Sequence, residues 1–230
     1  TESIVADMSR HFNHFKELGK DYAVSEPGVF YRDFEKKTLE RGLIMPSYPA
    51  SRELCTIGGM VANNAGGEKT LKYGKTERYV EEIKMVLADG KEHIFRKLGE
   101  RELELKKNED SFEGDIYKKL SKLIFDNRPL LHSAKPHVTK NSAGYYLWNV
   151  WDEDKKIFDI NKLLVGSQGT LGIITEVKIS LVRLKPKTRL LIIFLNDLKD
   201  LGPLTKKILE FKPESFESYD DNTFRLAIRF

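Results

Sequence analysis

Several residue patterns that define large classes of protein are missing from this chain. Cys55 is the single cysteine among 230 residues, which excludes an internal disulfide and any cysteine-rich metal cluster. Charge of one sign is missing as well, because 39 basic and 35 acidic residues are mixed along the sequence and leave a net charge of +4. Nucleic-acid-binding proteins more often carry a one-signed patch interleaved with aromatic residues. We therefore expect no nucleic-acid partner.

Long hydrophobic runs are also missing. The apolar run at residues 190–195 is far shorter than the about 20 residues that cross a bilayer, so we expect no transmembrane segment. The histidines show no ligand-like spacing apart from His11 and His14, which we expect in a loop, so we expect no metal site. The composition, 40% hydrophobic with 16 glycines, is typical of a globular protein. We expect it in the cytoplasm, with peripheral attachment to the inner membrane face as the alternative.

Two glycine-rich segments far apart in the chain, at residues 56–67 and 165–176, are its most informative feature. Both alternate glycine with small side chains, and both adjoin apolar sequence. Glycine allows backbone amides to approach a large ligand closely, and phosphates above all. The two segments therefore predict a site where backbone amides from both places converge on one dinucleotide.

Local patterns in the first part of the chain predict short alternating elements. The expected elements are strands at residues 3–8 and 22–26, helices at 31–41 and 116–125, an extended approach from residues 43–45 through Pro46 and Pro49, and a short helix that begins at Gly58 and Gly59. Gly42 stands where a helix would end, and Asp89-Gly90 between two apolar runs predicts a tight hairpin. We expect a solvated excursion at 97–115 and irregular structure at 129–142. The expected inner face of the helix at 116–125 consists of Ile116, Leu120, Leu123 and Ile124.

The second part of the chain predicts a domain boundary. Residues 162–184 predict two apolar strands separated by the second glycine-rich segment, and Lys185-Pro186-Lys187 marks the boundary. The elements expected beyond it are a strand at 190–195, a helix at 201–211 and a strand at 215–219, as in a β-α-β unit. We therefore expect one domain at 1–184 and the beginning of a second at 185–230. The apolar ends suggest a fragment or one half of an assembly.

The run from Pro49 to Gly67, followed by Tyr73-Gly74, resembles the second flavin-contacting segment of the vanillyl-alcohol-oxidase (PCMH) type of FAD-binding domain. Within that superfamily it is most similar to the branch of D-lactate dehydrogenases and glycolate oxidase flavin subunits. The hairpin at 86–90 and the segments 140–145 and 164–176 agree in the same order. The resemblance implies an α+β fold with a mixed sheet and flanking helices. It also implies the start of a ferredoxin-like cap domain.

The resemblance implies a set of residues that contact FAD. Those of the first segment are Ala50, Ser51, Arg52, Glu53, Leu54, Cys55, Thr56, Gly58, Gly59, Asn63, Asn64, Ala65 and Gly66, and those of the second are Gln168, Gly169, Thr170, Leu171, Gly172, Ile173 and Ile174. Bare amides at a helix start would attract phosphate, and the two isoleucines would give the flavin ring an apolar wall.

Each of these contacts has a simpler alternative. Glycines of the first segment suit close packing of a helix on a sheet, and those of the second suit a β-bulge. Asn63 and Asn64 suit a helix cap, and Cys55 suits a small buried filler. His137 and Lys140 adjoin a segment that faces the flavin in the resembling proteins, but a surface loop is the alternative.

The sequence also departs from the family pattern. Another glycine-rich pyrophosphate loop, the metal-binding histidine motif and most of the substrate pocket have no counterpart in these residues. Gln168 stands where this branch usually has glutamate, which keeps the size and drops a charge. No catalytic base is assigned.

The implied activity is FAD-dependent oxidation of a D-2-hydroxy acid such as D-lactate or glycolate, with hydride transfer to flavin N5. Electrons would pass to an acceptor such as a quinone, a cytochrome or an iron–sulfur subunit. One alternative is a non-catalytic FAD-binding or subunit-interaction module that needs another chain. A second is another oxidoreductase of the superfamily, such as UDP-N-acetylenolpyruvoylglucosamine reductase, against which the segment 140–145 argues.

Overall fold

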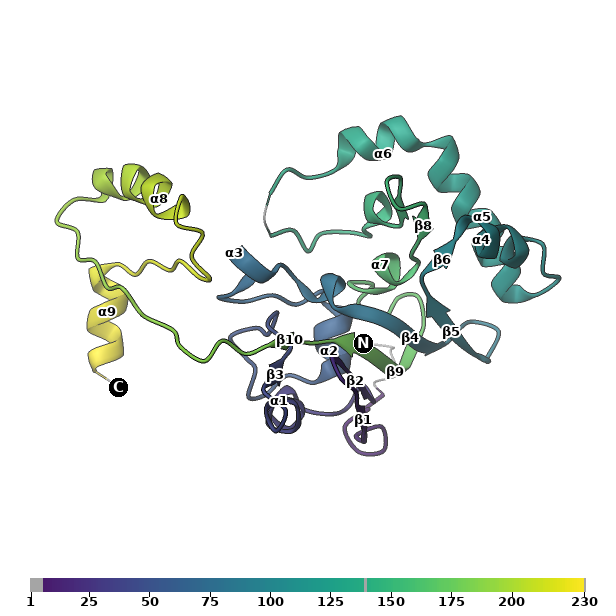
Figure 1. Cartoon of the computed structure of the whole chain (residues 1–230), viewed down its shortest axis with the longest axis horizontal. Coiled ribbons are helices and arrows are strands. Elements are labelled where there is room, and N and C mark those ends of the chain that lie inside the picture. Colours follow the sequence, from purple (N-terminus) through teal and green to yellow (C-terminus); the bar gives the residue numbers. More distant parts are fainter. Residues whose placement is uncertain (1–5, 139, 230) are drawn as a thin grey trace.

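A computed structural model describes residues 6–138 and 140–229, and its central element is a five-stranded sheet in the order β1-β2-β9-β4-β5 (Figure 1). The strands of this sheet are β1 (Phe15–Leu18), β2 (Tyr22–Ser25), β4 (Val80–Val86), β5 (Glu92–Arg96) and β9 (Ile173–Ser180). Every pairing in the sheet is antiparallel. The α+β prediction is confirmed, although a mixed sheet was expected and these strands pair in antiparallel fashion throughout.

Smaller strands and helices surround this sheet. The remaining strands are β3 (Leu43–Ile44), which pairs with β10 (Val182–Arg183), and β6 (Leu98–Gly99), β7 (Trp151–Asp152) and β8 (Ile157–Phe158), which form a sheet in the order β6-β8-β7. The helices are α1 (Tyr31–Leu39), α2 (Ile57–Ala62), α3 (Thr70–Tyr73), α4 (Glu100–Lys107), α5 (Phe112–Asp126), α6 (Arg128–Ala134), α7 (Asn161–Leu164), α8 (Leu201–Leu209) and α9 (Asp221–Ile228). Short 3₁₀ turns lie at Thr76–Arg78, Leu147–Asn149 and Leu198–Asp200.

The hairpin and the first helix form where local sequence predicts them. Gly90 has a φ of 74° in the turn between β4 and β5, a left-handed conformation that glycine adopts without strain. Helix α1 buries Tyr31, Phe34 and Thr38, the spacing of one helical face. Gly42, with a φ of 64°, then turns the chain into β3. The strand predicted at 22–26 is confirmed as β2, and the segment at 43–45, expected to be extended, contains β3.

Helix α5 presents a face to the core that differs from the expected one. Its buried residues include Tyr117, Ser121 and Ile124, whereas Leu123 is 45% exposed. The ring of Tyr117 lies between those of Phe95 and Phe158, at centroid distances of 6.3 and 6.0 Å. These long-range aromatic contacts set how α5 is rotated about its axis. The face that the helix buries is therefore shifted by about one residue from the predicted face.

Several other predictions are wrong. The excursion at 97–115 contains α4, which buries Leu103, and the segment at 129–142 contains most of α6. The first of the two strands expected in 162–184 is instead the end of helix α7, because a short apolar run does not distinguish a strand from a buried helical turn. Of the strand expected at 3–8, residues 3–5 lie outside the described part of the chain, and residues 6–8 are not extended strand.

Residues 186–229 form an arm that leaves the main body after β10, at the left of Figure 1. The helix predicted at 201–211 is confirmed as α8, but residues 190–195 and 215–219 form no strand. A strand needs a neighbour for its backbone groups, and no backbone hydrogen bond is described for residues 185–196. The apolar side chains at 190–195 are correspondingly 39–86% exposed.

Candidate functional site

Helix α2 begins at the first glycine-rich segment, and its N-terminal amides already have partners inside the protein. The hydroxyl of Thr56 caps the helix by accepting from the Gly59 amide at 3.3 Å. The Gly58 amide donates to the Pro27 carbonyl at 2.7 Å, and the Ile57 amide donates to Val29 at 2.9 Å. The expectation that Gly58 and Gly59 offer bare amides to a phosphate is therefore wrong for this conformation.

Most glycines of this segment allow close contact between chain segments. A Cβ at Gly58 would lie 2.5 Å from the Cβ of Pro27, and one at Gly67 would lie 2.3 Å from the Tyr48 carbonyl oxygen. A Cβ at Gly66 would lie 2.6 Å from the Thr70 hydroxyl. The packing alternative thus accounts for these three glycines.

The other end of α2 meets the second glycine-rich segment. The Gly166 amide donates to the Val61 carbonyl and the Gln168 amide donates to the Ala62 carbonyl, both at 2.9 Å. Gly166 and Gln168 have φ values of 88° and 53°, a left-handed turn that folds the loop back against the helix end. The two segments therefore lie side by side, and their convergence on one dinucleotide stays a prediction. We call this meeting of residues 61–67 with residues 165–172 the glycine junction.

Asn64 lies inside the glycine junction. Its side chain is fully buried, and its Oδ1 accepts from the Glu77 amide at 3.1 Å. The Nδ2 group is buried without a hydrogen-bond partner among the described residues, next to Gly166, where a Cβ would lie 3.2 Å from the Asn64 Cβ. Asn63, by contrast, is exposed, and its backbone amide ends α2 by donating a hydrogen bond to the Gly59 carbonyl.

The outer part of the second segment is open. Gly169 has a φ of 76° with free space where its Cβ would lie, whereas Gly172, with a φ of 159°, packs against Val86. Ile173 is 51% exposed and Ile174 is 9% exposed, because successive strand residues point to opposite faces. Only Ile173 is thus exposed enough to form an apolar wall, and Ile174 belongs to the core.

Residues 50–56 form a turn on the surface beside α1. Leu54 at its tip is 74% exposed, and Ala50, Ser51 and Glu53 are exposed as well. Arg52 lies over the Tyr48 ring, 5.1 Å from the centroid. Leu171 is partly buried against the core at the start of β9.

Cys55 and Ala65 are tied to the fold through their backbones. The Cys55 carbonyl accepts from the Tyr31 amide at 2.9 Å, and burial raises the pKa of its thiol. The Ala65 carbonyl accepts from the amide and the hydroxyl of Thr76, at 3.0 and 2.8 Å. The thiol therefore fits the alternative in which Cys55 is a small side chain that fills space in the fold.

Residues 140–146 form a loop that adjoins the glycine junction and that residue spacing alone does not place there. The Tyr145 hydroxyl and the Thr170 hydroxyl are hydrogen-bonded at 2.7 Å. Lys75, which the sequence analysis did not single out, donates from its ammonium to the Asn141 carbonyl and to the Ser142 hydroxyl. We call residues 140–146 the bridging loop.

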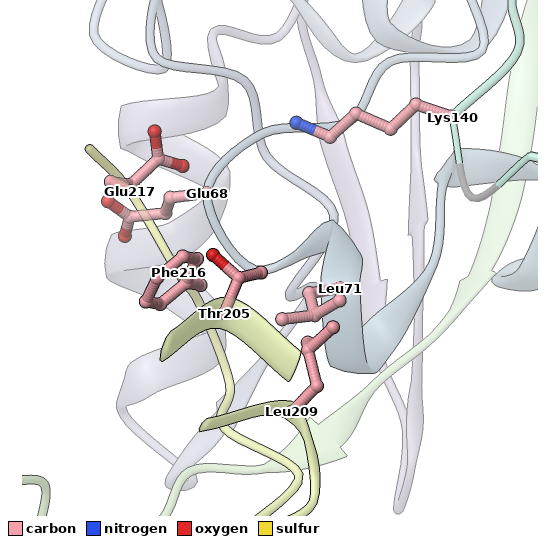
Figure 2. A pocket seen from close by; sticks show the side chains of 7 residues that line it. All are labelled: Glu68, Leu71, Lys140, Thr205, Leu209, Phe216 and Glu217. Atoms are coloured by element: carbon pink, nitrogen blue, oxygen red, sulfur yellow. The ribbon is translucent and has the colours of Figure 1, made fainter. Parts of the chain in front are cut away.

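The arm packs on α3, just beyond the first glycine-rich segment. The Glu214 carboxylate is 2.8 Å from the Lys185 ammonium and accepts from the Tyr73 hydroxyl at 2.9 Å. A cavity of about 380 Å³ lies between α3 and α8, with Leu71 of α3 and Leu209 of α8 among its lining residues (Figure 2). It is lined by Glu68, Leu71, Lys140, Thr205, Leu209, Phe216 and Glu217.

Metal ligands and membrane spans were both predicted to be absent. In residues 6–138 and 140–229, no three His, Cys, Asp or Glu side chains are grouped so as to hold a metal ion. None of the helices in this described part has the length and hydrophobicity needed to cross a membrane.

The chemistry of the glycine junction suits a phosphate-bearing cofactor. The amides of Gly66, Gly67, Gly169 and Gly172 have no backbone partner among the described residues, and the Asn64 amide group adds an unpartnered donor. Acidic residues adjoin both segments, because Glu68 follows Gly67, Glu176 follows Thr175, and the Glu77 amide bonds to the Asn64 side chain. Unpartnered backbone N–H groups of this kind can donate to an anion such as a phosphate.

These features define the class, an α+β domain that binds a nucleotide cofactor. The family of FAD binding domains matches residues 1–96, and this part of the chain is an FAD binding domain. The predicted family and its cofactor, FAD, are thereby confirmed. The second glycine-rich segment lies outside the matched residues and reaches the site through its contacts with α2.

Curated relatives extend this similarity along the chain. A D-2-hydroxyglutarate dehydrogenase of Pseudomonas putida is 26% identical over 236 residues, covering 100% of this chain and 23% of that protein. The glycolate oxidase subunit GlcD of Bacillus subtilis is 30% identical, covering 82% of this chain and 29% of that subunit. A D-lactate dehydrogenase of Archaeoglobus fulgidus is 31% identical, covering 73% of this chain and 25% of that protein. The chain thus spans less than a third of the length of each.

Proposed function

We propose that this chain supplies the FAD-binding part of an oxidoreductase that converts a D-2-hydroxy acid to the corresponding 2-oxo acid. The observation that carries the proposal is the glycine junction, in which Gly166 and Gln168 bond to the end of α2. The printed names of the relatives support the substrate class, because they are dehydrogenases of D-2-hydroxyglutarate and D-lactate and a subunit of glycolate oxidase.

The residues of the glycine junction would hold the cofactor. Unpartnered amides of Gly66, Gly67 and Gly169 would donate to phosphate oxygens, with hydroxyls of Ser51 and Thr170 at the rim. Ile173, half exposed at the start of β9, would exclude water from the flavin ring. When bound, FAD supplies the chemistry by accepting a hydride from the α-carbon of the acid. Thr56, Gly58 and Gly59 would act indirectly, by fixing the position of α2.

We propose that residues 185–230 begin a second domain, which covers the substrate side of the site. The contact of Glu214 with Lys185 and Tyr73 supports this, since it places the arm beside α3. The strands of a ferredoxin-like unit are not formed at 190–195 and 215–219, so only its helix, α8, supports that topology.

The electrons require an acceptor, and we propose a quinone, a cytochrome or an iron–sulfur subunit. The relative named as a subunit of glycolate oxidase supports a partner chain. We propose a cytoplasmic location, which suits a chain whose single cysteine is an unpaired thiol.

The test uses purified protein, FAD and ultraviolet–visible spectra under anaerobic conditions. Titration with FAD measures binding, and addition of D-2-hydroxyglutarate, D-lactate or glycolate tests for loss of the oxidised flavin absorbance. L-2-hydroxyglutarate and L-lactate serve as matched controls. Bleaching by a D-acid or by glycolate supports the proposal, and a protein that binds no FAD overturns it.

A matched pair of variants locates the binding. Gly169 and Gly90 have φ values of 76° and 74°, both with free space for a Cβ, so alanine strains each backbone by a similar amount, about 1–2 kcal/mol. We expect Gly169→Ala to weaken FAD binding and Gly90→Ala, in the β4–β5 turn, to leave it unchanged. Equal affinities would remove Gly169 from the site.

A second candidate function is a non-catalytic FAD-binding module. The observation that favours it is that the Gly58 amide is already occupied by Pro27, which leaves the helix start without a free donor there. FAD that binds but is bleached by no 2-hydroxy acid would select this candidate.

A further inference from the structure

Lys75 is a buried cation without an anionic partner. It is 4% exposed, and no other basic side chain among the described residues is buried to that degree. No carboxylate in the described part of the chain lies within ion-pair distance of its ammonium, and burial lowers the pKa of Lys75. Burial of an unpaired charge opposes folding. Packing alone would favour a methionine of similar length at this position.

The ammonium of Lys75 is directed at the bridging loop. It donates to the Asn141 carbonyl and, at 2.5 Å, to the Ser142 hydroxyl. It also lies 5.6 Å from the centroid of the Tyr146 ring, and the Tyr146 hydroxyl donates to the same Asn141 carbonyl. Lys75 thus joins the two ends of the loop as well as holding its beginning.

The backbone next to Lys75 is fixed to the first glycine-rich segment. Thr76 donates from its amide and its hydroxyl to the Ala65 carbonyl, and a Cβ at Gly66 would lie 3.1 Å from the Lys75 Cγ. The far end of the loop is fixed to the second segment by the Tyr145–Thr170 hydrogen bond. The bridging loop therefore spans the glycine junction and is anchored on both sides.

We propose that Lys75 is a positioning residue, which holds the bridging loop across the glycine junction and so fixes one wall of the FAD site. The part of this inference that concerns FAD rests on the proposed function. The part that concerns the loop does not, because it depends only on contacts within the protein. Lys75 acts on the cofactor through the loop and is not itself a catalytic residue.

The experiment compares the wild type with Lys75→Met, which keeps the length and removes the donors. Lys140 is exposed at the start of the loop, so the rate of trypsin cleavage after Lys140 reports how often the loop opens. We expect about a tenfold faster cleavage in Lys75→Met, the effect of losing hydrogen bonds to two acceptors. The matched control is Lys91→Met, an exposed lysine in the β4–β5 turn, which should leave the rate unchanged.

Two further readouts separate positioning from a general loss of stability. The urea midpoint of Lys75→Met should stay near that of the wild type, while the fluorescence of Trp148, whose ring centroid is 5.1 Å from that of Tyr146, should shift. Trp151→Phe removes the other tryptophan from the signal. FAD titration should show a dissociation constant about tenfold higher in Lys75→Met.

Ser142→Ala keeps the test decisive if Lys75→Met fails to fold. It removes one acceptor from an exposed residue, and we expect faster cleavage after Lys140, with no additional effect in the double variant with Lys75→Met. Unchanged cleavage in Ser142→Ala and in Lys75→Met overturns the proposal that Lys75 holds the bridging loop in place. Faster cleavage with unchanged FAD affinity overturns the role at the cofactor site. A wild type that binds no FAD overturns the proposed function, and the cleavage rates still decide whether Lys75 holds the bridging loop.

Discussion

Gly58 and Gly59 are adjacent glycines, but the structure leaves much less room for an alanine side chain at Gly58 than at Gly59. An alanine Cβ at Gly58 would lie 2.5 Å from the Pro27 Cβ and 3.0 Å from its carbonyl oxygen, whereas at Gly59 the nearest atom is the Thr56 hydroxyl at 3.3 Å. Both residues lie in the first turn of α2. We therefore predict that Gly58→Ala destabilises the protein and that Gly59→Ala does not.

The magnitude follows from three effects at Gly58. Overpacking against Pro27 costs about 1–3 kcal/mol, and moving the backbone away weakens the 2.7 Å bond from the Gly58 amide to the Pro27 carbonyl, worth about 1 kcal/mol. Replacing glycine by alanine in a helix returns up to about 1 kcal/mol. The net loss in unfolding free energy is about 1–3 kcal/mol. At Gly59 only the helix gain and a slight adjustment of Thr56 remain.

Urea unfolding of the two variants and the wild type, followed by circular dichroism, measures the difference. We expect unchanged m-values, a lower midpoint for Gly58→Ala and a midpoint no lower than that of the wild type for Gly59→Ala. Equal midpoints for the two variants would refute the assignment of Gly58 to packing. If only FAD affinity fell in Gly58→Ala, the residue would instead belong to the ligand.

Three further predictions concern buried and charged groups. Tyr31→Phe removes the hydroxyl that donates to the Met45 carbonyl at 2.7 Å, and urea titration should show a loss of about 1–2 kcal/mol; no loss would contradict this bond. Burial raises the pKa of Glu26, but hydrogen bonds from Lys16 and His14 outweigh that effect and lower it to about 2. The ionised Glu26 therefore stabilises the fold above the ordinary glutamate pKa of 4.5, and this stabilisation is lost as the pH falls toward 2. Acid unfolding curves of the wild type and Glu26→Gln should therefore converge at low pH, and parallel curves would argue against the effect. The hydrogen bond from Lys185 lowers the pKa of Glu214 to about 2, and Glu214→Gln should speed amide exchange in the arm at neutral pH, whereas unchanged exchange would show that this carboxylate does not hold the arm.

Features set by neighbouring residues could be predicted from the sequence. The turn at Asp89-Gly90 and the end of α1 at Gly42 depend on the left-handed conformation of single glycines, which local sequence reveals. The glycine junction was also predictable, because both of its segments carry the same unusual composition.

Features set by distant residues could not be predicted in the same way. The occupation of the Gly58 amide depends on Pro27, which no local pattern connects to α2. The apolar run at 190–195 has the composition of a buried strand, but a strand also requires a neighbour, and composition does not reveal whether one is present. The hydrogen bond from Lys75 to the Asn141 carbonyl likewise joins residues far apart in sequence.

The pairing of β9 constrains the order in which a newly made chain acquires its structure. Strand β9 pairs with β2 on one side and with β4 on the other, and its first residue, Ile173, directly follows residues 165–172 of the glycine junction. During synthesis the β4–β5 hairpin can close at once, because its strands are neighbours in sequence. Strands β1 and β2 must wait, as a lone pair, until the ribosome has released β9. The glycine junction is therefore among the last parts of this sheet region to be assembled, and a nascent chain stalled before β9 would lack one side of the proposed FAD site.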